Sequence, residues 1–152
     1  LRQEVEVRRA AERRVREQAS LLDVAREAIS VHTLDGRVTY WNRGAERVYG
    51  WAAADVLGKD AASVVGAAEG NAARGQLLAA GEWAGDVRHV TRDGREVLVE
   101  SRRTLVRDDA GDPQAILVVS TDVTDRRRLE AQLLRTQRLD SIGVLTGGIA
   151  HD

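Results

Sequence analysis

Residues 28–58, AISVHTLDGRVTYWNRGAERVYGWAAADVLG, decide the fold class of this chain. Two runs rich in β-branched and aromatic residues flank Asp35-Gly36, and Asp-Gly between such runs is a strong hairpin signal. A type I′ turn, which needs positive φ at both central residues, is expected there. Asn42 is suited to cap a following short helix, and Gly50 and Gly58 are suited to end short helices. The segment therefore predicts a β-hairpin followed by short helices.

The hairpin signal recurs further along the chain, where VRHVTR and REVLVE flank Asp93-Gly94. Another β-rich run, SRRTLV, precedes a turn-rich connection that holds the single proline, and AILVVSTDV then has the composition of a buried central strand. Short helical segments fill residues 42–80, and Gly81 can end the last of them. The order of two strands, several short helices and three strands predicts an α+β fold. We expect a five-stranded antiparallel sheet with the short helices on one face.

Long helices are predicted at both ends of the chain, over residues 1–27 and 125–152. Each would be ~40 Å long at about 1.5 Å per residue, which exceeds the size of one small domain. Contacts with a partner chain in a coiled coil are therefore expected, with a solvated helix lying on its own domain as the alternative for the first. Apolar residues form a stripe on the first helix, at Leu1, Val5, Val15, Ala19 and Leu22. A seam of three- and four-residue spacing marks the second, at Leu129, Leu133, Thr136, Leu139, Ile142, Thr146 and Ile149.

Composition excludes several classes of site. The chain has no cysteine, which rules out disulfides, thiolate zinc sites, cysteine nucleophiles and cysteinyl-flavin chemistry. His32, His89 and His151 are not at metal-ligand spacing, so a histidine metal site would need acidic residues brought in by the fold. The 23 basic and 24 acidic residues leave a net charge of −1, which argues against a nucleic-acid or anionic-membrane surface. The arginines at 126–128 lack a helix-turn-helix context, and a solvated helix face explains them.

The start of the chain and its hydropathy bear on its location. No secretory signal and no membrane span are predicted, so we expect a cytoplasmic domain without membrane contact of its own. The absence of methionine indicates that Leu1 is not a natural start. We therefore expect a longer parent protein, and membrane anchoring of that parent stays open.

Two long stretches resemble the halves of a PAS sensor domain, with the first over residues 25–59 and the second over residues 81–130. The second stretch ends in Asp-Val-Thr at residues 122–124. The resemblance implies a PAS domain over residues 28–124, between an N-terminal helical linker at 1–27 and a signalling helix at 125–152. The first stretch carries the motif positions Asp35-Gly36, Asn42, Ala45-Glu46, Gly50-Trp51, Val56 and Gly58.

The last residues, QRLDSIGVLTGGIAHD, resemble the phosphoacceptor box of bacterial sensor histidine kinases of the HisKA type. That resemblance implies a dimeric four-helix bundle in which His151 accepts the phosphoryl group and Asp152 is the assisting acid. A neutral imidazole can attack the γ-phosphoryl group of ATP, and a carboxylate can take up the ring proton. Two consecutive glycines before the histidine cost a helix about 2 kcal/mol relative to alanines, which favours a functional reason for them.

The function implied is that of a sensory or regulatory PAS segment in a two-component sensor histidine kinase. It would act as a parallel homodimer and pass the phosphoryl group to the receiver domain of a response regulator. ATP and Mg²⁺ would be held by a catalytic domain outside these residues, so no turnover is expected from this chain alone. The alternative is a non-enzymatic PAS module that holds partners together without a ligand.

Signal relay is expected at the junction between the last strand and the exit helix. Asp122 can accept a hydrogen bond or pair with an arginine, and Thr124 or Asp125 can cap the helix. A simple strand-to-helix turn without a relay role is the alternative interpretation.

PAS ligands bind between the sheet and the helices, and the candidate pocket residues here are Trp41, Asn42, Trp51 and Trp83. Core filling is the alternative for each tryptophan. The resemblance implies that a haem-binding member would carry a histidine on the long helix before the third strand. Haem is not expected here, because residues 70–81 hold no histidine and His32 and His89 fall on predicted strands. Non-covalent flavin or a small metabolite stays open, and a ligand-free relay module is the preferred interpretation.

Overall fold

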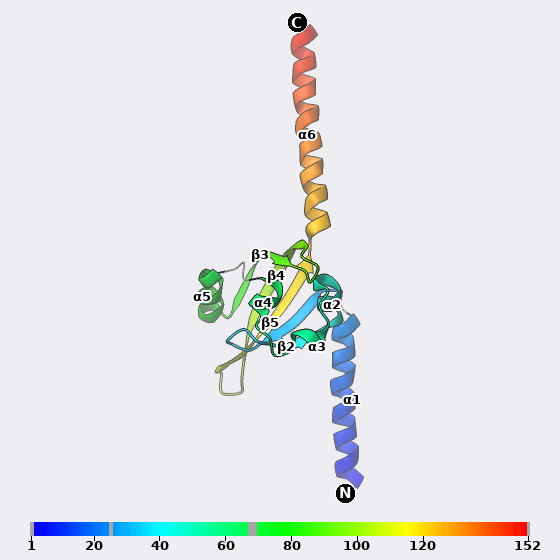
Figure 1. Cartoon of the computed structure of the whole chain (residues 1–152), viewed down its shortest axis with the longest axis vertical. Coiled ribbons are helices and arrows are strands. Elements are labelled where there is room, and N and C mark those ends of the chain that lie inside the picture. Colours follow the sequence, from blue (N-terminus) through cyan, green and yellow to red (C-terminus); the bar gives the residue numbers. More distant parts are fainter. Residues whose placement is uncertain (1, 25, 67–69, 152) are drawn as a thin grey trace. The chain divides into compact units, whose positions relative to one another are not determined.

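The computed structural model describes residues 2–24, 26–66 and 70–151, with the backbone alone for 19, 20, 22–24, 70, 71, 141 and 143–151. The chain divides into two compact units, Leu1–Asp122 and Val123–Asp152. The first unit holds helix α1 (Arg2–Val24) and a sheet with its short helices, and the second unit is helix α6 (Thr124–His151). Figure 1 shows these elements along the chain.

The predicted order of two strands, short helices and three strands is confirmed. The first hairpin is β1 (Ala28–His32) and β2 (Val38–Trp41). Four short helices follow, α2 (Arg43–Tyr49), α3 (Ala53–Val56), α4 (Ala61–Val65) and α5 (Gly70–Ala80). The remaining strands are β3 (Glu82–Val90), β4 (Glu96–Arg107) and β5 (Pro113–Asp122). The runs REVLVE and SRRTLV, which the sequence suggested as separate segments, belong to the single strand β4.

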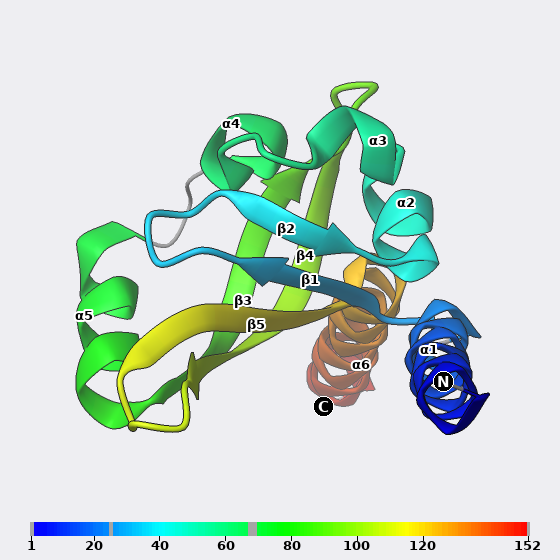
Figure 2. The same cartoon turned by 90° about the horizontal axis from the view of Figure 1, so that it is seen from below.

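The five strands form one antiparallel sheet in the order β2-β1-β5-β4-β3, as Figure 2 shows from below. β5 lies in the centre because it pairs with β1 along one edge and with β4 along the other. Its residues alternate between the two faces, with Ile116, Val118 and Ser120 buried and Leu117 and Val119 half-buried. This pattern confirms that AILVVSTDV is a central strand.

The two Asp-Gly turns differ from the prediction. Gly36 has a φ of 92°, but Asp35 has negative φ, so the turn is not type I′. The Gly36 amide donates to the Thr33 carbonyl at 3.0 Å, and the Thr33 amide donates to the Arg37 carbonyl at 2.8 Å. This is a three-residue loop, with a type I turn followed by a left-handed glycine. The Thr33 hydroxyl favours it, since it bonds to Asp35 and accepts from the Arg37 amide. The turn at residues 91–95 repeats these contacts.

Asn42 joins the first helix to the sheet. It is the N-cap of α2, as predicted, and its Oδ1 accepts the Ala45 amide at 2.8 Å. The same oxygen also accepts the Ile29 amide of β1 at 2.8 Å, and Nδ2 donates to the Glu27 carbonyl at 3.1 Å. Asn42 is only 1% exposed, so these bonds satisfy polar groups that water does not reach. Gly50, in the left-handed region at φ 74°, ends α2 as predicted.

The helices pack against the inner face of the sheet. α2 contacts β1, α3 contacts β2, α4 contacts β3, and α5 contacts β3 and β4. The hydrophobic core lies between these layers, and its most completely buried valines are Val38, Val56 and Val99.

Helix α6 is 28 residues long, which is about 42 Å at the α-helical rise. Four residues of the predicted seam, Leu129, Leu133, Leu139 and Ile142, are between 59% and 66% exposed. Thr146 and Ile149 have side chains outside the described residues. These four aliphatic side chains thus face solvent, and pairing of the seam with a partner helix stays a prediction.

Helix α1 has 23 residues, or about 35 Å. Val5 and Val15 of its predicted stripe are exposed, while Leu1 and the side chains of Ala19 and Leu22 lie outside the described residues. In the described part of the chain, neither this helix nor any other has both the length and the apolar character needed to cross a membrane.

Candidate functional site

A cavity of about 330 Å³ lies between the inner face of the sheet and the short helices. Its walls combine apolar and polar side chains from all five strands and from α2, α4 and α5. The apolar lining consists of Ala28, Trp41, Ala61, Ala62, Val65, Leu77, Ile116 and Val118. The polar lining consists of Ser30, His32, Asp35, Tyr49, Asp60, Arg74, His89, Arg103 and Ser120.

Strand register aligns a row of five inward-facing residues across the sheet. Trp41 pairs with Ser30, Ser30 with Val118, Val118 with Arg103, and Arg103 with Trp83. Because residues directly opposite each other on neighbouring strands share a face, this central row spans the sheet from β2 to β3. It places a guanidinium group on the sheet wall between two tryptophans.

Arg103 is the charged member of the central row. It is half-buried, and its guanidinium carbon lies 5.3 Å from the centre of the Trp83 ring, a cation–π contact. Burial lowers the pKa of Arg103, but a guanidinium stays protonated in proteins. Arg103 therefore supplies a permanent positive charge to the cavity wall.

His89 and Tyr49 form a buried pair that also lines the cavity. The Tyr49 hydroxyl lies 2.8 Å from His89 Nδ1, and His89 is only 4% exposed. Burial lowers the pKa of His89 to about 4 and raises the pKa of Tyr49 to about 12. Both groups are therefore neutral at pH 7 and act as hydrogen-bonding groups in the cavity.

His32 is the second histidine of the cavity. Its Nε2 shares a 3.0 Å hydrogen bond with the Ser30 hydroxyl on the same strand. Burial, and next the positive charge of Arg103, lower the pKa of His32 to about 4. The imidazole is therefore neutral at pH 7, and Arg103 lies close enough for its charge to act on it.

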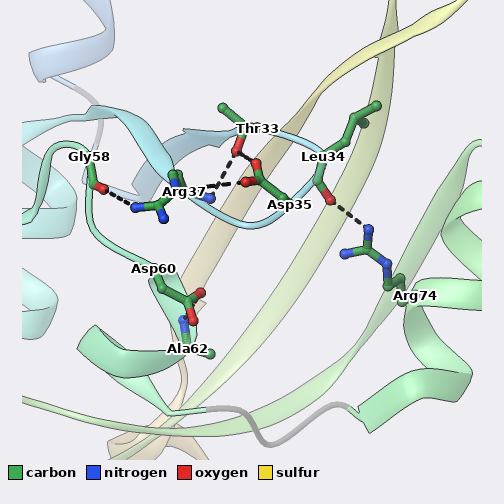
Figure 3. Close-up of polar contacts among 8 residues, drawn as sticks. All are labelled: Thr33, Leu34, Asp35, Arg37, Gly58, Asp60, Ala62 and Arg74. Atoms are coloured by element: carbon green, nitrogen blue, oxygen red, sulfur yellow. Dashed lines mark hydrogen bonds and ion pairs between the residues drawn. The ribbon is translucent and has the colours of Figure 1, made fainter.

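Polar contacts join the turn between β1 and β2, which supplies Asp35 and Gly36 to the cavity lining, to neighbouring segments, as Figure 3 shows. Arg74 of α5 donates to the Leu34 carbonyl at 2.7 Å. Arg37 donates to the Gly58 carbonyl at 3.0 Å, which ties the same turn to the segment before α4. Asp60 accepts the Ala62 amide at 3.2 Å and so caps α4. The first two contacts join the turn to α5 and to the segment before α4.

We predict that acidification destabilises the first unit through its two buried histidines. The folded-state pKa values of His32 and His89 are about 4 against an ordinary value of 6.5, so the unfolded chain binds more protons between these limits. The contribution of the two neutral histidines to the free energy of unfolding is therefore fully present above pH 6.5. It is lost as the pH falls toward 4. Urea unfolding at about pH 7.5 and about pH 5 measures this loss.

The matched variant for this measurement is His89→Gln, which keeps a polar side chain but cannot titrate. Its loss of stability between the two pH values should be smaller than that of the wild-type chain. Equal losses in the two proteins would show that His89 does not cause the pH dependence.

A protein-family model described as PAS fold matches residues 22–128, which is most of the chain. The chain belongs to the PAS family. The resemblance of its sequence to PAS sensor domains is thereby confirmed, and the sheet with its helices is the PAS fold.

Solved structures agree with this assignment. A PAS domain from Colwellia psychrerythraea has a TM-score of 0.64 at 21% identity, covering 73% of this chain and 98% of that one. A PAS domain from a two-component sensor histidine kinase has a TM-score of 0.64 at 17% identity, covering 74% and 98%. An RNA-binding light-oxygen-voltage receptor has a TM-score of 0.68 at 26% identity, covering 80% of this chain but 36% of that one. The last two proteins are a histidine kinase and an RNA-binding receptor, so the shared fold does not decide the function of this PAS domain.

Of the four residues predicted to form the pocket, only Trp41 is among the residues that line the cavity. Trp41 lines the cavity, and its Nε1 donates to the Trp51 carbonyl at 3.0 Å. Asn42, Trp51 and Trp83 are not among the lining residues. The guanidinium carbon of Arg92 lies 4.9 Å from the centre of the Trp51 ring. Trp83 packs against the hydrophobic core.

Apart from Trp41, the lining residues were not among the sequence-based pocket candidates, and those missed include His32, Tyr49, His89 and Arg103. The signal that could have found the strand residues is alternation, since it places every second side chain of a strand on the face that the short helices cover. In the described part of the PAS domain, no group of three or more histidine, aspartate or glutamate side chains could hold a metal ion.

The relay and phosphoacceptor candidates follow the cavity strand in sequence. Asp122 is the last residue of β5, opposite Val99, and its side chain is exposed. Thr124 is the first residue of α6, one position later than an N-cap would be. His151 is the last residue of α6, with its side chain outside the described part, and Asp152 lies outside the described residues.

Proposed function

We propose that this PAS domain controls autophosphorylation of His151 in a two-component sensor histidine kinase. The proposal rests on one observation above others: a single helix, α6, begins two residues after β5 and contains the GGIAH run up to His151. The central strand of the sensor and the phosphoacceptor segment are thus consecutive elements of one chain. The family alone would not carry the proposal, because PAS domains serve several outputs.

We further propose that the active form is a parallel homodimer. The seam residues Leu129, Leu133, Leu139 and Ile142 are exposed in the single chain and recur at the spacing that paired helices bury. Burying one leucine or isoleucine side chain contributes about 1.5–3 kcal/mol, so four on each helix favour pairing. A parallel arrangement would bring the two copies of α6 together in register.

The chemistry required of the parent kinase is a phosphoryl transfer between nitrogen and oxygen. A ring nitrogen of His151 would attack the γ-phosphorus of ATP as the bond to the β-phosphate oxygen breaks, which releases ADP. Asp152 would take the ring proton. The phosphoryl group would then pass from His151 to an aspartate carboxylate in the receiver domain of a response regulator.

The relay predicts that Asp122→Ala changes the autophosphorylation rate of the full-length protein several-fold, because the substitution alters the junction of β5 and α6. The melting temperature should stay within about 2 °C, since Asp122 is exposed and its removal leaves the core intact. Rates are measured with radiolabelled ATP, and light scattering checks that the dimer persists.

The matched control for Asp122→Ala is Asp109→Ala, which removes another exposed carboxylate in the loop before β5. That variant should keep the wild-type rate. If Asp122→Ala also keeps the wild-type rate under every signal condition, the proposed relay role of Asp122 is wrong.

A further inference from the structure

We infer that strand β3 is an interaction surface that binds the same strand of a second copy of this chain. The two strands run antiparallel about a twofold axis at Val87, so that two five-stranded sheets become one continuous sheet. The inference goes beyond the proposed function, because this contact uses none of the seam residues of α6.

The two edge strands of the sheet differ in how far they are closed. β2 has four residues, its partner β1 shifts register, and Val38 exchanges backbone hydrogen bonds with Gly58 and Lys59. β3 has nine residues in continuous register with β4, and in the described part of the chain no strand pairs with its other side. A long edge strand without proline or a bulge is a template for another strand. β3 is therefore the edge that can accept a partner.

The direction of the backbone groups restricts how two copies of β3 can pair. At one end of the strand the Thr91 amide donates to the Arg95 carbonyl. At the other end the Gly81 carbonyl accepts from the Leu105 amide of β4. Since the direction alternates, odd-numbered residues of β3 face β4, and even-numbered residues direct their N–H and C=O groups to the open edge. Two copies therefore pair only in registers that set even-numbered residues opposite one another.

The side chains of these even-numbered residues form a self-complementary pattern on the outer face of the sheet. All of them are exposed, namely Glu82, Ala84, Asp86, Arg88 and Val90. With the axis at Val87, Asp86 of each copy lies opposite Arg88 of the other, and Ala84 lies opposite Val90. An axis at Asp86 or at Arg88 would set like charges opposite each other, which destabilises a cross-strand pair. Charge therefore favours the register centred on Val87 over its two neighbours.

The pairing does not need Asp86 or Arg88 to lack partners within the chain. Arg88 donates to Glu96 of β4 at 3.1 Å, and both side chains are exposed. A guanidinium has five N–H donors, so it can bind a second carboxylate at the same time. Exposed ion pairs contribute little binding energy, so the charges set the register. The strands are held by about eight backbone hydrogen bonds, because each hydrogen-bonded residue pair exchanges two.

Edge pairing and the proposed pairing of α6 use different surfaces of the chain. A chain with two self-complementary surfaces can bind two copies of itself, so the β3 edge would join one α6-paired dimer to the next. This consequence rests on the proposed function, whereas edge pairing does not.

Disulfide cross-linking of the 152-residue chain tests the register, because the sequence has no cysteine of its own. Ala84→Cys and Val90→Cys are made in separate chains, mixed, and oxidised with glutathione disulfide. Opposite residues of a hydrogen-bonded antiparallel pair have Cα atoms about 5.5 Å apart, which suits a disulfide. In either variant alone, the two introduced thiols would lie about 20 Å apart along the strands. The mixture should therefore form covalent dimers at least about fivefold faster than either variant alone.

The single variants are the matched controls for random collision. Equal rates in the mixture and in the single variants would overturn the inference. Absence of a cross-linked dimer at about 0.5 mM chain would overturn it as well.

Charge reversal tests why this register is favoured. Asp86→Arg sets two arginines opposite each other on both sides of the axis. It should lower the association constant from sedimentation equilibrium at least about fivefold at low salt. The double variant Asp86→Arg/Arg88→Asp has opposite charges again and should regain the wild-type value. α6 is the same in all these proteins, so its pairing contributes equally to each.

Circular dichroism checks that the variants are folded, as expected for exposed positions. If Asp86→Arg is unfolded, Arg88→Asp replaces it, since it sets two aspartates opposite each other and should weaken association equally. Association unchanged by charge reversal, or a folded double variant that does not recover, would contradict the inference. None of these measurements uses phosphorylation, so failure of edge pairing and failure of the kinase proposal are distinguishable.

Discussion

His151→Gln is expected to abolish labelling of the full-length protein by ATP that carries a radioactive γ-phosphate, with a loss of at least about a hundredfold. Glutamine has a similar polar shape but no ring nitrogen with a nucleophilic lone pair, so no phosphorus–nitrogen bond can form. The label in the wild-type protein should be lost in acid and kept in base, as a phosphohistidine is. Peptide mass spectrometry then places the phosphoryl group on residue 151.

The control for this experiment is His32→Gln, since His32 lies on β1 and not on the signalling helix. That variant should keep the label. Labelling that persists in His151→Gln would show that another residue is the acceptor. A wild-type protein that takes no label under any condition would favour the alternative, a PAS module that holds partners together without enzymatic output.

Asn42→Ala is expected to lower the free energy of unfolding of the first unit by about 3 kcal/mol. The substitution removes the acceptor of both the Ile29 and the Ala45 amide, and the donor to the Glu27 carbonyl. Two buried amides left without a partner each cost about 1–3 kcal/mol, which exceeds the cost of losing an ordinary helix cap. Urea unfolding followed by circular dichroism measures the change.

Asp60→Ala supplies the comparison for Asn42→Ala. Asp60 also caps a short helix, but its carboxylate is exposed and accepts the single amide of Ala62. Its loss should cost about 1 kcal/mol or less, because water can replace the bond. If the two variants are equally stable, Asn42 acts as a helix cap and its bond to β1 contributes nothing.

Local patterns in the sequence were sufficient to predict the order of strands and helices in the fold. The composition of the strands, the glycine stops and the capping position of Asn42 depend on neighbours within a few residues, and they predict the observed order. The bond from Asn42 to Ile29 was not predictable in this way, because the two residues are 13 positions apart and meet only when the sheet forms. The turn type was missed for a different reason: the Thr33 hydroxyl stabilises a longer loop than Asp-Gly alone would favour.

The candidate site was less accessible to sequence reasoning than the fold. Trp41 was a pocket candidate and lines the cavity, but Arg103 was not a candidate, since an arginine on an isolated strand is expected to face water. Alternation along β4 places Arg103 on the inner face, but only the register of β4 against β5 places it opposite Val118. A site built from side chains of five strands therefore depends on pairings that no single segment encodes.

The central position of β5 has a consequence for local unfolding. Hydrogen bonds on both edges protect its backbone, while the outermost strand β3 pairs with β4 alone, and β2 pairs with β1 and, at Val38, with Gly58 and Lys59. Opening of β5 requires loss of its pairing with both β1 and β4, so its amides should exchange with solvent only through the largest opening events of the domain. The strand that lines the cavity and leads toward α6 thus opens only with its neighbours, whereas β3 can open by losing its pairing with β4 alone.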